Sequence, residues 1–291
     1  MIEWDNMAII FAVIAYFSWA IGIFFEAIAA RRINSYSLTF WGLVIGAILS
    51  SFYLPFAFHL AQGFTLGFFL LNLFLALFFI GGTIVYYEAL KEENRSLTGT
   101  IASAFPVFTV ILSVFFLGER VDLIHSLAII VTFIGLMLCI LDFKEISGGK
   151  KIVSKGTVFA LIASVSWGIY FAFVKLLVVE VGWFWPNYIV FLLFPLMFLF
   201  MKVRKIELKL PTVNHVFWPL IISVVLVRIA EYSYNFAITK GQVAIVAPIA
   251  GANPTLFVVL AFLFLKAPIK NQQILGIIIT LAGIVFLSFV G

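Results

Sequence analysis

Ten apolar runs, each about 20 residues long, follow one another along the whole of this 291-residue chain. They cover residues 8–30, 36–58, 67–90, 97–117, 123–141, 156–179, 184–202, 216–238, 243–265 and 272–290. A helix needs roughly 20 apolar residues to cross a bilayer, and continuous runs favour helices over the alternating strands of a barrel. Because only 11% of the residues are charged and the mean hydropathy is +1.21, no soluble surface can be built. We therefore predict an all-α integral membrane protein with ten transmembrane helices.

The first half of the chain matches the second half at a constant offset of 148 residues. The segment FAVIAYFSWAI (11–21) aligns with FALIASVSWGI (159–169), with seven identities in eleven positions. The segment IASAFPVFTVILSVFFL (101–117) aligns with IAGANPTLFVVLAFLFL (249–265), with eight identities in seventeen. Shared apolar composition raises such counts, but it does not explain why Ser-Trp and Pro coincide in one register. The chain is therefore interpreted as a duplication.

Each repeat contains five spans, and this odd number determines how the two halves are oriented. The second half must enter the membrane from the opposite side, which makes an inverted repeat. We predict the two five-helix repeats at residues 1–145 and 155–291. Inverted repeats place a binding site at their interface near the bilayer midplane, and their relative tilt can expose it to either side. The architecture therefore favours a transporter over a structural membrane protein.

The lysines and arginines lie mainly on one side of this arrangement. The connections after spans 1, 3, 5, 7 and 9 contain fourteen of the eighteen, and the other side contains only Arg120 and Lys240. The positive-inside rule then predicts that both termini are outside, in a multi-pass protein of the plasma (cell inner) membrane. The net charge of +5 is thus a topology signal, and we expect the lipid bilayer and no nucleic acid as a partner.

One long stretch resembles a known family. The sequence YYEALKEENRSLTGTIASAFPVFTVILSVFFLGERVDLIHSLAIIVTFIGLML (86–138) is similar to the C-terminal part of an EamA domain of the drug/metabolite transporter superfamily. The matching features are Tyr-x-x-Ala-Leu at its start, Pro106 within a span, and Leu-Gly-Glu-Arg at 117–120. Residues 234–286 resemble the same unit, although Leu-Lys-Ala-Pro (265–268) replaces Leu-Gly-Glu-Arg there.

The resemblance implies a ten-helix carrier in which helices 1, 3, 4, 6, 8 and 9 surround a cavity and helices 5 and 10 are peripheral. Members move amino acids, sugars, nucleotide derivatives or drugs. Two features of this chain depart from relatives. Related amino-acid exporters are placed with both termini in the cytoplasm, whereas the Lys/Arg count predicts the opposite. The small multidrug branch uses an acidic residue in helix 1, and Trp19 occupies that place here, which weakens the case for proton-driven export of lipophilic cations.

Four polar residues share one face of the eighth span. Arg228, Glu231, Tyr232 and Asn235 follow the spacing i, i+3, i+4 and i+7. A charge near the bilayer centre costs roughly 2.5–3.5 kcal/mol on insertion scales, so this face must be turned to the bundle interior or to water. One interpretation is an ion pair that stabilises helix packing. The other is a site in which Arg228 binds a carboxylate or phosphate and Glu231 meets an ammonium or takes a proton.

The repeat bears on that choice. At the offset of 148, Ile80 and Thr83 occupy the places of Arg228 and Glu231, so the first half lacks both charges. A pair required by the shared architecture would be expected in both copies, and its presence in one favours a specialised site.

Further candidates lie near the middles of other spans. Pro106 and Pro254 occupy corresponding places in spans 4 and 9, and interrupted helices at such places are typical of transporter sites. A kink that serves only packing is the alternative. Trp19 and Trp167 could stack on a substrate or fill space between helices. The predicted substrate-binding set is Arg228, Glu231, Tyr232, Asn235, Asn253, Trp19, Trp167, Tyr86 and Tyr87, with helix kinks at Pro106 and Pro254.

The remaining charges receive positional interpretations. We expect Glu26 to reach the inner surface near Arg31, and Lys175 to reach the outer surface, with a cavity role as its alternative. The Leu-Gly-Glu-Arg segment (117–120) is expected to cap the fourth span and to anchor the outer surface rather than to bind a ligand. Cys139 is expected to be a packed thiol, and no metal-ligand or nucleotide-loop motif is present, so we predict no cofactor, no metal and no enzymatic activity.

The pattern as a whole predicts a carrier that moves a small polar metabolite, most simply an amino acid or a relative, by alternating access through a central cavity. A carrier of sugar-like or phosphorylated solutes is the alternative within the class. A non-transporting membrane partner protein is the alternative outside it. The expected partners are a small-molecule substrate and the bilayer, and the expected state is a monomer or homodimer.

Overall fold

A computed structural model describes residues 2–30, 32–58, 63–89, 101–140, 155–211, 214–266 and 268–290, and within these ranges the chain forms helices and no strand. Seven helical segments in this part are long and apolar enough to cross a membrane: Met7–Ala30, Leu66–Ala89, Lys155–Val181, Trp185–Val203, Val216–Lys240, Val243–Leu265 and Asn271–Phe289. Shorter apolar helices occupy Ser35–Ser51, Phe105–Phe116 and Leu123–Cys139. The predicted all-α class is confirmed.

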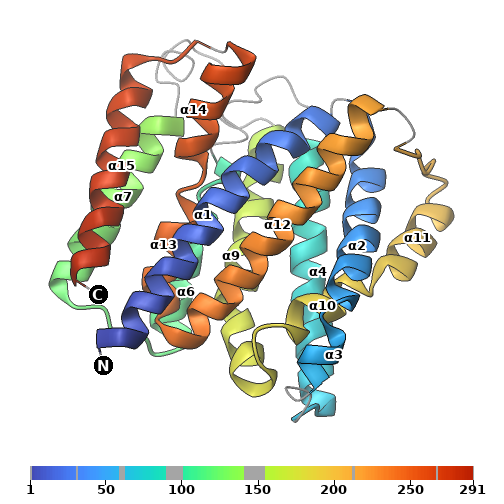
Figure 1. The fold of residues 1–291 in the computed structure, drawn as a ribbon, viewed down its shortest axis with the longest axis horizontal. Coiled ribbons are helices and arrows are strands. Elements are labelled where there is room, and N and C mark those ends of the chain that lie inside the picture. The colour runs from blue at the N-terminus through green and yellow to red at the C-terminus, as the bar shows by residue number, and fades with distance from the viewer. Residues whose placement is uncertain are drawn as a thin grey trace.

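The helices lie side by side in one bundle (Figure 1). They are α1 (Ile2–Ala30), α2 (Ser35–Ser51), α3 (Leu54–Ala57), α4 (Leu66–Ala89), α6 (Phe105–Phe116), α7 (Leu123–Ile140), α9 (Lys155–Val181), α10 (Trp185–Phe191), α11 (Phe194–Val203), α12 (Asn214–Lys240), α13 (Val243–Gly251), α14 (Pro254–Leu265) and α15 (Asn271–Val290). Both chain ends lie at one end of the bundle, with the α12–α13 turn; we call it the terminal end. The opposite end carries the connections that include residues 32–34, 204–211, 266 and 268–270, and we call it the basic end.

Two helices are interrupted at corresponding places of the repeat. Helices α13 and α14 are separated by a turn at Ala252 and Asn253, and Pro254 is the first residue of α14. Helix α6 follows a turn at Ser103 and Ala104, with Pro106 in its first turn. Proline has no N–H to donate and is tolerated in the first turn of a helix. Both predicted kink residues therefore lie in the first turn of a helical segment that follows a break.

Helices α7 and α15 pack closely and run antiparallel. A Cβ added to Gly135 would collide with Thr280, and one added to Gly283 would collide with Thr132. The offset of 148 relates Thr132 to Thr280 and Gly135 to Gly283. The two contacts are therefore equivalent: each joins the glycine of one repeat to the threonine of the other. Small residues let helix backbones approach closely in a membrane.

Four of the long helices form two pairs, and each pair joins one helix from each half of the chain. Helix α1 packs along α12, where Gly22 lies against Leu226 and Val227. Helix α4 packs along α9, where Gly82 lies against Ser166 and Trp167. The interface between the two halves therefore passes through the middle of the bundle, and it is there that the polar side chains collect.

Candidate substrate-binding site

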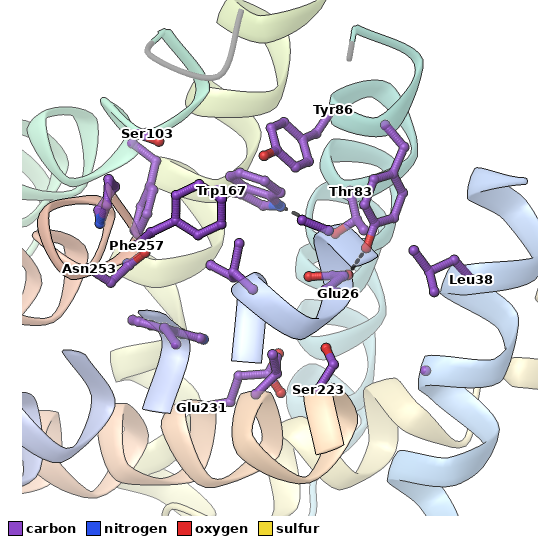
Figure 2. Close-up of a pocket in the computed structure, with 18 of the residues that line it drawn as sticks. Glu26, Leu38, Thr83, Tyr86, Ser103, Trp167, Ser223, Glu231, Asn253 and Phe257 are labelled. Carbon is purple, nitrogen blue, oxygen red and sulfur yellow. Dashed lines mark hydrogen bonds between the residues drawn. The ribbon is translucent and has the colours of Figure 1, made fainter. Parts of the chain in front are cut away.

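A cavity of about 470 Å³ lies between the two halves of the chain. Its lining comes from α1, α2, α4, α9, α12 and α14, with Ser103 and Phe105 at the start of α6 and with Cys139 and Gln273 at its edge. Figure 2 shows side chains from several of these helices pointing toward one another across the space. The lining residues lie in the middle of the bundle and in the half nearer the basic end. Glu26 is close to the last residue of α1 and Leu220 is close to the first residue of α12, and both of these helix ends lie at the basic end.

Arg228 and Glu231 meet in this cavity as an ion pair. Arg228 Nη1 lies 2.9 Å from Glu231 Oε2, and the side chains are 13% and 3% exposed. The guanidinium of Arg228 also lies 4.2 Å from the centre of the Phe191 ring, and its stem passes Gly46 so closely that any side chain there would crowd it. Arg228 Nε has no hydrogen-bond partner among the described residues. The guanidinium is thus held from one side and has a buried N–H donor that no described residue accepts.

Glu26 is a cavity residue that the sequence interpretation placed elsewhere. It was expected at the inner surface, but its carboxylate lines the cavity, where Tyr87 Oη donates a hydrogen bond to Glu26 Oε1 (Figure 2). Arg228 and Glu231 are close enough to interact with it electrostatically. The spacing of seven residues from Trp19 puts both on one face of α1, and that signal could have identified Glu26.

Aromatic side chains form much of the remaining wall. The rings of Tyr86 and Trp167 are 5.1 Å apart, and Trp167 Nε1 donates to Thr83 Oγ1 at 3.4 Å. Trp19 lies 5.3 Å from Phe171, measured between ring centroids. All of these residues line the cavity. Of the predicted set, the structure therefore brings together Arg228, Glu231, Trp19, Trp167, Tyr86, Tyr87 and Asn253.

The two prolines differ in their relation to the cavity. Pro254 lines it together with Asn253, whose side-chain nitrogen donates to the carbonyl of Ala250 at 3.2 Å. Pro106 is not part of the lining and packs against Gly251, where a Cβ would collide with its ring.

Tyr232 and Asn235 also lie outside the lining of this cavity. Tyr232 donates to Ser50 Oγ at 2.7 Å and borders a second, apolar cavity of about 490 Å³ between α1, α2, α12 and the α9–α10 connection. Asn235 is 1% exposed and donates to Asn187 Oδ1 at 3.1 Å. One and two helical turns from Arg228, these residues are closer to the terminal end, so the polar stripe continues past the cavity. Arg228 borders both cavities.

Glu119 and Lys175 hold the turn between α12 and α13, and we call these two residues the clasp. Both oxygens of Glu119 accept backbone N–H groups, from Val243 at 2.8 Å and from Ala244 at 2.8 Å. Lys175 Nζ donates to the carbonyls of Ile238 and Gly241, the latter at 2.9 Å. The carboxylate of Glu119 therefore caps α13, while its backbone N–H donates to the carbonyl of Ser113 at 3.3 Å and caps α6 as expected of the Leu-Gly-Glu-Arg segment. Lys175 is bonded to the end of α12 rather than reaching the surface or the cavity.

A bundle of long apolar helices with a solute-sized, charged cavity between two related halves defines a multi-pass membrane protein of the carrier type. The family model of the EamA-like transporter family matches residues 6–141 and 154–289, nearly the whole chain. The chain belongs to this family, which confirms the resemblance, and it is a membrane transporter of the drug/metabolite superfamily.

The chain is also similar to one curated protein and to one solved structure. An uncharacterized protein of Methanocaldococcus jannaschii is 40% identical over 68 residues, which are 23% of this chain and 50% of that protein. The match thus spans about half the length of this curated relative. A crystal structure of a protein superposes with a TM-score of 0.79 at 16% identity, and the alignment covers 97% of this chain and 96% of the other. At that identity the superposition shows the fold alone.

Proposed function

We propose that this protein carries an amino acid or a close relative across the plasma (cell inner) membrane by alternating access. The observation that supports this best is the Arg228–Glu231 pair in a cavity whose other walls are largely aromatic. Arg228 keeps an unpartnered Nε for a carboxylate, and a carboxylate side chain is available for an ammonium group. The aromatic walls suit the apolar part of such a molecule, and about 470 Å³ is within the size range of small-molecule sites.

The proposal includes ten spans arranged as inverted repeats at residues 1–145 and 155–291. The three shorter apolar helices overlap the three predicted runs in which no long helix lies, and this supports ten crossings. The Gly135–Thr280 contact and the Thr132–Gly283 contact are equivalent under the offset of 148, and both join helices that run antiparallel. This supports the inversion of one repeat relative to the other. Both chain ends lie at the end opposite the basic connections, which supports termini outside the cell.

In this conformation the cavity faces the cytoplasm, because it occupies the half of the bundle nearer the basic end. The lining comes from one chain, so a monomer is sufficient for binding, and a homodimer would contain two independent sites. A carrier for phosphorylated solutes is less well supported, because Arg228 is the only lysine or arginine among the described lining residues and two carboxylates lie near it.

Flux in proteoliposomes with a panel of labelled amino acids tests the proposal. Arg228→Lys keeps the positive charge for Glu231 but loses the planar fork. We expect flux of the preferred amino acid to fall at least about 10-fold, because a hydrogen bond to a charged group contributes about 1.5–3 kcal/mol. The matched control is Arg204→Lys, an exposed arginine at the basic end. Unchanged flux in Arg228→Lys would remove the site assignment, and a folded wild type without flux for any amino acid would remove the substrate class.

A further inference from the structure

We propose that Glu26 is the residue that selects for a positively charged amino group in the substrate, and this inference rests on the proposed function. Three charged side chains line the cavity within the described part of the chain: Glu26, Arg228 and Glu231. Arg228 and Glu231 pair at 2.9 Å. Glu26 is therefore the carboxylate left without a lysine, arginine or histidine of its own in the lining, although a charge within a membrane span needs a counter-charge.

Tyr87 fixes the position of that carboxylate. Its hydroxyl donates to Glu26 Oε1 from the neighbouring helix α4, so the carboxylate is oriented and remains an acceptor for a second donor. Tyr87 is buried, and Glu26 is half-buried at the edge of the open volume. A ligand ammonium supplies N–H donors and the missing charge at the same time.

The aromatic rings beside Glu26 suit the same group. Tyr86, Tyr87 and Trp167 lie close to one another, with Tyr86 5.7 Å from Tyr87 and 5.1 Å from Trp167 between ring centroids. Figure 2 shows Glu26 on the side of the cavity where Tyr86 and Trp167 lie. Aromatic faces attract ammonium groups by cation–π interaction, whereas the electron-rich face of a ring repels a carboxylate.

The repeat shows that this arrangement is not required by the architecture. At the offset of 148, Val174 corresponds to Glu26 and Asn235 corresponds to Tyr87. Val174 is 0% exposed and Asn235 is 1% exposed, so the corresponding place in the other half is filled by packing. The acidic side chain of Glu26 and the cavity beside it therefore occur in one half of the chain and not at the corresponding place in the other, as expected of a binding subsite.

Three probes with the same ring and different charges separate the roles of Glu26 and Arg228. Tryptamine carries only the amine, L-tryptophan carries both groups, and indole-3-propionate carries only the carboxylate. We expect Glu26→Gln to weaken binding of tryptamine and L-tryptophan at least 10-fold and to leave indole-3-propionate unchanged, measured by calorimetry on the purified full chain at pH 7. The matched control is Glu88→Gln, a half-buried glutamate of α4 that does not line the cavity.

The outcomes distinguish this inference from the proposed function. If Glu26→Gln weakens binding of all three probes equally, or of none of them, the amine subsite is overturned. In that case, a loss of L-tryptophan and indole-3-propionate binding in Arg228→Lys would still support the carboxylate site. Wild-type protein that binds none of the probes also overturns it, and amino-acid flux then decides the proposed function. Should Glu26→Gln fail to fold, Tyr87→Phe, which removes only the orienting hydroxyl, must show the same selective loss in smaller measure.

Discussion

The two ends of the bundle are built from corresponding residues but are bonded differently. Toward the terminal end, Tyr170 Oη donates to Asn187 Oδ1 at 2.6 Å, and Asn235 Nδ2 donates to the same oxygen at 3.1 Å. The three residues come from α9, α10 and α12, and all are at most 2% exposed. A buried network of this kind ties three helices together, because each donor would be left unsatisfied if they separated.

The corresponding residues toward the basic end make no such network. The offset of 148 leads from Tyr170 to Gly22, from Asn187 to Thr39 and from Asn235 to Tyr87. Thr39 Oγ1 donates to a carbonyl of its own helix, and Tyr87 donates to Glu26. Both Thr39 and Tyr87 line the cavity. Residues at corresponding positions of the repeat therefore form a buried hydrogen-bond network toward the terminal end and line the cavity toward the basic end.

The clasp shows the same contrast. Glu119 and Lys175 hold the α12–α13 turn at the terminal end through charged hydrogen bonds. The offset of 148 relates Lys175 to Ala27, which lines the cavity and cannot form such bonds, and relates Glu119 to Ala267, which lies outside the described residues. The contrast teaches that the conformation of such a carrier can be set by residues that differ between its repeats. Under alternating access, the bonds at the terminal end must break when the cavity opens there.

Removing the clasp should have the largest effect on this contrast. The double variant Glu119→Ala, Lys175→Ala removes charged hydrogen bonds worth about 1.5–3 kcal/mol each. We expect the terminal end to open more often, by roughly 100-fold for about 3 kcal/mol. A cysteine at Ala247, 1% exposed on α13, reports this as its rate of labelling by a membrane-impermeant reagent, in a background where Cys139 is replaced by serine.

The control for this experiment is Arg120→Ala, which removes an exposed charge next to Glu119. It should leave the labelling rate of the Ala247→Cys reporter unchanged. Equal labelling in the clasp variant and the control would mean that the clasp does not hold the terminal end closed.

A smaller effect is expected from the buried network. Asn187→Ala leaves the Tyr170 hydroxyl without its acceptor and leaves Asn235 Nδ2 with only the carbonyl of Trp183, at a cost of about 1–3 kcal/mol. We expect faster labelling of the same reporter, about 10-fold, and a lower Tm. Thr39→Ala at the corresponding position should not change labelling at the terminal end, since Thr39 bonds within its own helix. Similar labelling in both variants would argue that the two ends are equivalent.

The spans were predictable from the sequence because apolar length alone sets them. The run at 156–179 became α9, Lys155–Val181, and the run at 67–90 became α4, Leu66–Ala89. Breaks beside Pro106 and Pro254 were also foreseeable, because proline cannot continue the hydrogen-bond ladder. Spacing likewise put Arg228 and Glu231 on one face, and the cavity lies against that face.

Depth and partners could not be predicted in the same way. Helical periodicity gives the face of Tyr232 and Asn235 but not where along the axis the cavity ends. The partners of Glu119 and Lys175 are backbone groups of a turn more than sixty residues away, and backbone groups carry no sequence signal. Glu26 was assigned to the surface from its neighbour Arg31 in the sequence, whereas its hydrogen-bond partner Tyr87 comes from another helix.

The smallest expected effect concerns the starts of α7 and α15, which also correspond in the repeat. Asp122 Oδ1 accepts the N–H of His125 and contacts its Nδ1, both at 2.8 Å, and these hydrogen bonds hold the pKa of Asp122 below its usual range. At the other end Gln273 Oε1 accepts the N–H of Lys270 at 2.9 Å, and an amide does not titrate. A depressed carboxyl pKa adds stability above the unfolded-state value of about 4, and this contribution is lost as the pH falls through the folded value.

The thermal stability of detergent-solubilised protein between pH 6 and pH 3 tests this last difference. The gap in Tm between wild type and Asp122→Asn should be small and should shrink as the pH falls from about 4 toward 3, because the folded protein loses the Asp122 charge only as the pH passes through its depressed pKa. The gap between wild type and Gln273→Ala should stay constant over the same range. A constant gap for Asp122→Asn would show that its carboxylate charge contributes nothing to the start of α7, since the uncharged side chain would then cap that helix equally well.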